Sequence, residues 1–338
     1  MESAWKLGRR PALDGIRGVA ILLVVACHAG QGLTGAGVEG VMLFFTLSGF
    51  LITSLLLEEH EHGPVRLRQF YLRRARRLLP ALGVLLVVVL VAGSWLPTGV
   101  TPGTAAAIVF YVTNWYAVAH PALNALSHTW SLAIEEQFYL LWPLVLMAVA
   151  RRGRLLRTAV AGAVVAFAAM AWGLATGHDE SLGRADVGAA ALLVGCALAT
   201  WMHRRPEGPS RSRVVLLGLA ALVPFVVAWH GWPARLALQV VTPLAAALMI
   251  WASAQGEGVA LLSGRVLGWV GRRSYAIYLW HFPILWVGAE ELGTGVLRVS
   301  LEVAAAFAVA ELSWRLVEAP FLRRRPARKT TPSLAVTH

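Results

Sequence analysis

Three ionisable side chains interrupt the first long apolar stretch of the sequence, residues 13–28. They are Asp14, Arg17 and His28. In an α-helix, successive residues turn by about 100°, so Arg17 and His28 fall within about 20° of one face and lie about 16 Å apart along the axis. Ionisable residues inside a membrane helix are costly and usually face a bundle interior or a cavity, which favours a functional site. The alternative is an interfacial Asp–Arg pair with a histidine satisfied in the core.

An arginine-rich run follows the second apolar stretch. Its four arginines occupy five positions directly after Phe70 and Tyr71, and they are Arg73, Arg74, Arg76 and Arg77. Arginine is suited to bidentate contacts with phosphate, so the run predicts a docking site for a phosphorylated cytoplasmic ligand. Anionic lipid headgroups would require the same residues and are the alternative.

A polar stripe marks a later apolar segment. Ser131, Glu135 and Tyr139 recur at every fourth position and therefore share one helix face, and Glu136 adjoins them. Two carboxylates near a helix start could simply favour the helix dipole. Because they lie a full turn into the helix, we expect at least one to pair with Arg17, His28 or His128.

Two further segments carry polar groups at membrane depth. Tyr278 and His281 are one helical turn apart, before Pro283, although a histidine beside Trp280 could be only an interfacial anchor. Ser48-Gly49 indicates a close packing point between helices, because a catalytic serine would need a base that nothing local supplies.

The composition is that of an integral membrane protein. Of 338 residues, 57% are hydrophobic and 14% are charged, against about a quarter charged in soluble domains. The net charge of +12 resides mainly in short loops between apolar runs, which argues against nucleic acid as a partner. Cys27 and Cys196 have neither disulfide nor metal-ligand spacing, so no metal site is expected.

The sequence predicts an all-α, polytopic helical bundle in the lipid bilayer, with about ten transmembrane helices. Residues 103–119 are expected to form one short re-entrant or interfacial helix in addition. The expected spans are 14–32, 38–57, 80–96, 131–149, 157–176, 186–202, 214–229, 236–254, 274–291 and 296–316.

The distribution of basic residues supports this count and sets the orientation. With ten spans, 25 Lys and Arg residues fall on the side of the N-terminus and three near the other side. This bias predicts a multi-pass protein of the cell (cytoplasmic) membrane with both termini in the cytoplasm.

The ordered motifs resemble those of the acyltransferase-3 family, polytopic acyl-CoA-dependent O-acyltransferases. They are LDGIRG with Arg17 eleven residues before His28, FFTLSGFLI, FYLRRARRLLP, HTWSLAIEEQFYLLWP, SYAIYLWHFP and a closing Glu318-Ala319-Pro320. Each is weak alone, but the ordered set is specific. Thr46 stands where relatives usually have valine, a difference that concerns packing only.

The resemblance implies a membrane domain at residues 10–322, in the stand-alone form, and a basic cytoplasmic tail at 323–338 that we expect to be disordered. It also implies transfer of an acetyl or other short acyl group from acyl-CoA to a hydroxyl. The acceptor would be a carbohydrate or glycosylated natural product, an envelope glycan or a macrolide-type antibiotic. Acyl-CoA, expected to be acetyl-CoA, would be a co-substrate, and no bound cofactor is expected.

Combining the resemblance with helix geometry gives a mechanistic expectation. The CoA phosphates would contact the arginine run, its pantetheine arm would pass Arg17, and His28 would be the general base. Glu135 or Glu136 would orient His28. Candidates for contacts with the acceptor or the oxyanion are Tyr139, Tyr278, His281, Ser131 and Asp14. Direct transfer is favoured, and an acyl-enzyme on Cys27 is the alternative.

The rival from another class is a membrane transporter or flippase, for which intramembrane charges are also typical. The sequence shows no repeat between its halves, which argues against it. A non-enzymatic scaffold would tolerate replacement of His28. Consumption of acyl-CoA would distinguish the enzyme from both.

Overall fold

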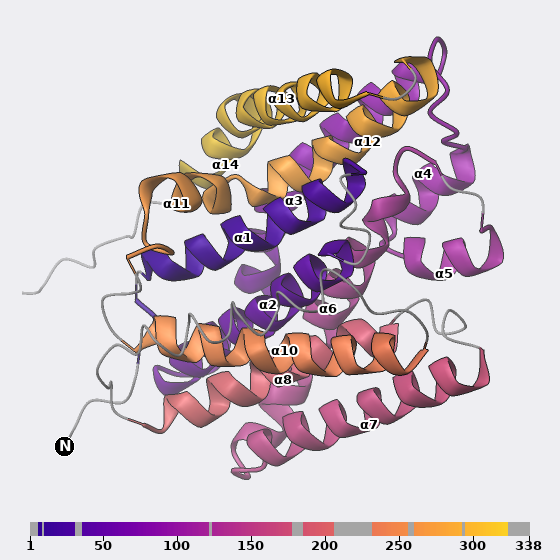
Figure 1. Cartoon of the computed structure of the whole chain (residues 1–338). Helices are drawn as coiled ribbons and strands as arrows, with labels where there is room; N and C mark the ends of the chain where they lie inside the picture. The colour runs from indigo at the N-terminus through magenta and orange to yellow at the C-terminus, as the bar shows by residue number, and fades with distance from the viewer. Residues whose placement is uncertain are drawn as a thin grey trace, which may run out of the picture.

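The computed structural model describes residues 6–8, 10–30, 36–121, 124–177, 185–205, 232–255, 260–292 and 295–323 (Figure 1). Within these ranges every regular element is a helix. The predicted all-α class is therefore confirmed.

α1 (Pro11–His28) and α2 (Ala36–Glu61) lie in the middle of the helix bundle, and the other helices pack on either side of this pair. α2 contacts α8 (Ala185–His203) and α10 (Trp232–Ala254), and α7 (Leu155–Thr176) lies against the outer side of α8. On the other side, α1 contacts α11 (Arg265–Arg272) and α12 (Ser274–Leu292), and α13 (Val296–Ser313) packs on α12 (Figure 1). The chain closes with a π-helical turn, Trp314–Glu318, and α14 (Ala319–Arg323).

Glycines let α2 and α8 approach at backbone contact. A Cβ atom added at Gly49 would lie 1.9 Å from the Leu192 carbonyl oxygen, and one at Gly195 would lie 2.0 Å from that of Thr46. The expected packing point at Gly49 is confirmed, and it fixes the neighbouring Ser48 on a closely held helix.

A second contact of this kind joins α1 to α11. A Cβ atom at Gly271 would lie 1.7 Å from the carbonyl oxygen of Asp14, and one at Gly18 would lie 2.5 Å from that of Leu267. The turns of α1 that carry Asp14 and Arg17 are therefore held directly against the backbone of α11.

α3 (Leu67–Ala92) and α6 (Trp130–Ala150) carry the arginine run and the polar stripe. Between them, residues 103–119 do not form the single short helix that we expected. They form α4 (Pro102–Val109) and α5 (Thr113–Ala119), separated at Tyr111, whose φ of 54° ends the helical path. Eight and seven residues extend only about 12 and 10 Å, so neither helix can span a bilayer, as expected.

Among the residues that the structure describes, seven helices are long and apolar enough to cross a membrane. They are Pro11–His28, Gly37–Glu61, Leu67–Ala92, Ser127–Ala150, Leu155–Thr176, Ala185–His203 and Leu236–Ala254. The expected spans 274–291 and 296–316 form α12 and α13 but are not among the seven, and span 214–229 lies outside the described residues. A multi-helix membrane protein is thus confirmed, and the count of ten is not.

The first span ends earlier than expected. α1 finishes at His28, where the sequence predicted a helix to residue 32, so His28 is the last helical residue and is exposed.

Candidate functional site

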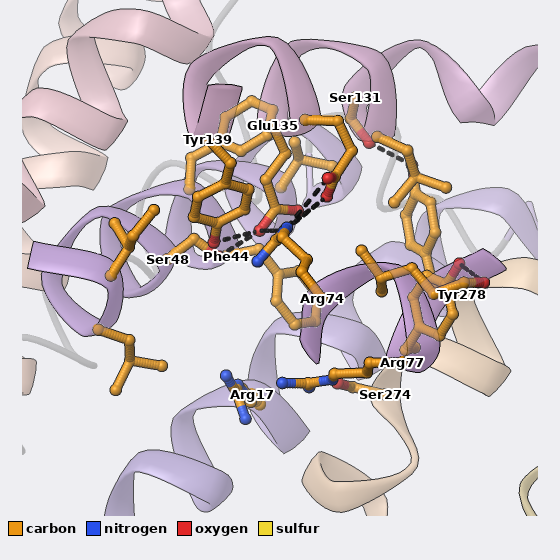
Figure 2. Close-up of a pocket in the computed structure, with 18 of the residues that line it drawn as sticks. Arg17, Phe44, Ser48, Arg74, Arg77, Ser131, Glu135, Tyr139, Ser274 and Tyr278 are labelled. Carbon is orange, nitrogen blue, oxygen red and sulfur yellow. Dashed lines mark hydrogen bonds and ion pairs between the residues drawn. The ribbon is translucent and has the colours of Figure 1, made fainter. Parts of the chain in front are cut away.

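A cavity of about 320 Å³ opens between α1, α2, α3, α6 and α12 (Figure 2). Its walls combine aromatic and aliphatic side chains with a concentrated set of charged and hydroxyl groups. The latter are Arg17, Ser48, Arg74, Arg77, Ser131, Glu135, Glu136, Tyr139, Ser274, Tyr275 and Tyr278. Most of the polar positions singled out in the sequence therefore meet at one place.

Arg74 is held by carboxylates of α6. Its Nε donates to Glu136 Oε1 at 2.8 Å and its Nη2 donates to the same oxygen at 2.6 Å. Glu135 Oε1 lies 3.6 Å from Nη2, and the guanidinium carbon lies 3.2 Å from the centre of the Tyr139 ring. The charge of Arg74 is thus matched within the protein.

Glu135 is the acceptor of a second set of hydrogen bonds. The Ser48 hydroxyl donates to its Oε1 at 2.6 Å, and the Tyr139 hydroxyl donates to the same atom at 2.7 Å. Tyr139 reaches it because a spacing of four residues places both side chains on one face of α6. Figure 2 shows these groups converging on one wall of the cavity.

The arginine run is divided between this cavity and the surface. Arg74 and the exposed Arg77 line the cavity, whereas the exposed Arg73 lies 3.5 Å from Glu59 and the exposed Arg76 is outside the lining. The structure thus brings two of the four arginines to the cavity, and a phosphate site made by all four stays a prediction. Arg17, which pairs with Asp14 at 3.8 Å, joins Arg77 in the lining.

His28 lies beside two other histidines at the far end of α1. Its Nδ1 is 2.9 Å from Nε2 of His281, a residue with no exposed surface. The His128 ring centre is 5.5 Å from that of His281, and Phe282 packs edge-on against His28 at 4.7 Å. Neither ring nitrogen of the buried His128 makes a hydrogen bond of standard geometry to the described residues.

Tyr278 connects the cavity to this histidine cluster. Its hydroxyl donates to the carbonyl oxygen of His128 at 2.6 Å and lies 2.6 Å from the Ser131 hydroxyl, while its ring centre is 5.6 Å from that of His281. Ser131 thus contacts α12, and its predicted neighbour on the stripe, Glu135, contacts α2.

The structure does not join His28 to a carboxylate in the way the sequence suggested. The hydrogen-bond and ion-pair partners recorded for Glu135 and Glu136 are Arg74, Ser48 and Tyr139, and the ring that contacts His28 Nδ1 is His281. The sequence predicts only a packing role for Ser48. A hydroxyl directly before the packing glycine of an apolar helix was the signal for its polar role.

No metal centre emerges from the described part of the chain, where no group of three or more His, Cys, Asp or Glu side chains has suitable geometry. The site is built instead from a cavity with cationic and carboxylate walls and an exposed histidine beyond it.

The chain matches known proteins along nearly its whole length. The family model described as an acyltransferase domain of the acyltransferase-3 type matches residues 10–310. Peptidoglycan O-acetyltransferase OatA of Listeria monocytogenes is 36% identical over 92% of the chain and 55% of its own length. The putative peptidoglycan O-acetyltransferase YrhL of Bacillus subtilis is 33% identical, over 92% of this chain and 54% of its own length.

A third relative is the putative O-acetyltransferase SAS0844 of Staphylococcus aureus, 32% identical over 94% of the chain and 58% of its own length. The chain thus spans little more than half the length of these relatives. No solved structure matches it. A family model covering nine-tenths of the chain, together with these identities, shows that the chain belongs to the acyltransferase-3 family.

Proposed function

We propose that the chain is an O-acyltransferase that moves an acetyl or other short acyl group from acyl-CoA to a hydroxyl group of peptidoglycan. The names of two relatives, which describe peptidoglycan O-acetyltransferases, support this acceptor over a macrolide-type product. Acetyl-CoA is the proposed donor, in the cytoplasmic membrane, with the cavity arginines on the cytoplasmic side as the loop charges suggest.

The donor would bind with its phosphates at Arg17 and Arg77. Both line the cavity, and no ion pair within 4 Å is recorded for Arg77 among the described residues. Arg74 is already matched by Glu136, so its proposed role is to hold the cavity wall. Asp14, beside Arg17, would orient that guanidinium.

The chemistry would take place at His28. Its imidazole takes the proton of the acceptor hydroxyl while the oxygen attacks the thioester carbonyl carbon. The tetrahedral intermediate then expels the CoA sulfur as the C–S bond breaks, and His28 returns the proton to the thiolate. The products are an ester of the acceptor and free CoA, and the histidine ends as it began.

One observation supports this proposal above the others. A single helix, α1, carries a cavity-lining arginine near one end and an exposed, partnered histidine at the other, about 16 Å apart. Tyr278 touches both places, and its hydroxyl is a candidate donor to the oxyanion or acceptor. A long, phosphorylated donor with a terminal reactive group fits this separation.

The test uses the full chain in lipid nanodiscs with acetyl-CoA and a soluble peptidoglycan fragment. Release of free CoA and formation of the fragment's ester are measured together. Replacing His28→Gln removes the general base and is expected to lower turnover by about 10²–10⁴-fold, while acetyl-CoA binding persists. The matched control is Cys27→Ala, at the adjacent position of α1, which keeps its turnover if transfer is direct.

Other results would refute the proposal. Full turnover in His28→Gln would remove the catalytic role of His28, and loss in Cys27→Ala would favour an acyl-enzyme. If acetyl-CoA remains intact with every acceptor while a substrate crosses the membrane unchanged, the protein is a transporter.

A further inference from the structure

The neighbours of His281 determine which of its two ring nitrogens carries a proton. Its Nδ1 lies 3.0 Å from the carbonyl oxygen of Ile277 and 2.8 Å from that of Tyr278. A carbonyl oxygen accepts hydrogen bonds and never donates them, so this nitrogen carries a proton. Both carbonyls belong to the preceding turn of α12, which therefore fixes the ring.

The other nitrogen of His281 must then hold a lone pair. His281 has no exposed surface, and the rings around it are those of His28, His128, Tyr278 and Phe282. Among the described residues no carboxylate forms an ion pair with His281, and a buried imidazolium without one is strongly disfavoured. The neutral ring has its proton on Nδ1, which makes Nε2 an acceptor.

This acceptor lies 2.9 Å from Nδ1 of His28. Because Nε2 of His281 has no proton to give, His28 must donate, and the proton of its own neutral ring resides on Nδ1. The lone pair of His28 is then on Nε2. We infer that His281 is a positioning residue that holds His28 in the Nδ1–H tautomer and so leaves Nε2 free to take a proton from the acceptor.

The arrangement resembles the logic of a catalytic triad with a different third member. In that logic, a group behind the base accepts the Nδ1 proton and sets the tautomer of the ring. Here a neutral histidine, itself anchored by two backbone carbonyls, performs this task where sequence reasoning expected Glu135 or Glu136. The inference rests on the proposed function only for its catalytic consequence, since the tautomer is a property of the resting protein.

Three replacements of His281 distinguish its role as a hydrogen-bond acceptor for His28 from a role in filling space. Gln extends an amide oxygen to about the position of Nε2 and preserves an acceptor for His28. Asn matches the Nδ1 position but is too short to reach His28, and Leu fills volume without polar atoms. The carbonyl of Val24 also interacts with the His28 ring. The three variants therefore also test whether this carbonyl alone is sufficient to hold His28 in the Nδ1–H tautomer.

The direct readout is nitrogen NMR of the full chain with ¹⁵N-labelled histidine in nanodiscs. The His28 signals are assigned by their loss in His28→Gln. We expect a pyridine-type Nε2 and a pyrrole-type Nδ1 in the unchanged protein and in His281→Gln, and a mixed tautomer in His281→Asn and His281→Leu. A pyrrole-type Nε2 in the unchanged protein, or an unaltered tautomer in all three variants, overturns the inference.

Acetyl transfer provides the second readout. His281→Gln is expected to stay within about tenfold of the unchanged protein, and His281→Asn and His281→Leu to lose up to about 10⁴-fold in kcat, the scale of a wrong tautomer, with KM for acetyl-CoA little changed. Equal losses in all three variants would indicate a packing role and refute positioning. If the unchanged protein transfers nothing yet shows the inferred tautomer, the proposed function fails and the positioning of His28 stands.

Discussion

The Arg74–Glu136 pair allows a prediction that separates a structural cation from a substrate-binding one. Replacing Arg74→Met removes three hydrogen bonds to Glu136 and the cation over the Tyr139 ring, and it leaves the carboxylates of Glu135 and Glu136 without their shared cation. We expect the protein to lose stability even without any ligand.

The magnitude follows from the burial of the pair. Removing one partner of a buried ion pair costs about 3–5 kcal/mol. The side chains of Arg74 and Glu136 keep 21% and 18% of their surface exposed toward the cavity, and water there screens part of the charge. We therefore expect a loss near the lower limit, about 3 kcal/mol in the free energy of unfolding.

The double variant Arg74→Met with Glu136→Gln is the matched control. It removes the charge that the single change leaves uncompensated, so it should recover at least about 1.5 kcal/mol, about half of the loss. Unfolding is followed by tryptophan fluorescence during titration with dodecyl sulfate in mixed micelles. A loss below about 1 kcal/mol for Arg74→Met, or a double variant no more stable than the single one, would refute the assignment of Arg74 as a cavity-wall residue.

Two other outcomes follow from the cavity and from the helix contacts. Arg77→Ala should raise the KM for acetyl-CoA about tenfold or more, because a charge-assisted contact is worth about 1.5–3 kcal/mol. Arg68, on the same helix, is exposed and outside the cavity lining, so Arg68→Ala should change the KM little. Equal effects of the two replacements would contradict a phosphate site at Arg77. Gly195→Ala should destabilise the protein by about 1–3 kcal/mol or more, because its Cβ would lie 2.0 Å from a carbonyl oxygen. The control is Gly83→Ala, where a Cβ meets nothing within 4 Å, and thermal melting should show no such loss for it.

The sequence predicted the helices well because membrane spans depend on local composition. Hydropathy alone located α1, α2 and α8, and a glycine in an apolar helix predicted the close crossing at Gly49. The break at Tyr111 was missed, because a left-handed backbone at a tyrosine has no local signature. Hydropathy likewise did not predict that α1 ends at His28.

The sequence predicted which residues form the candidate site but not which of their side chains contact each other. Spacing placed Ser131, Glu135 and Tyr139 on one face, and the structure brings all three to the cavity. Which group meets which depends on how distant segments pack, and His28 and His281 are separated by 253 positions. Helical spacing also could not tell which arginines of the run would face inward, since that requires the rotation of α3 against α6.

The glycine contact between α1 and α11 has a consequence for the choice of donor. The contacts at Gly271 and Gly18 hold the Arg17 end of α1 against α11, and the rise of the helix sets the interval of about 16 Å from Arg17 to His28. Under the proposed function, this interval sets the length that a donor needs to contact both Arg17 and His28. A compact donor such as acetyl phosphate would occupy one end at a time, whereas a donor with an extended arm would reach both, so the protein would select its donor by length.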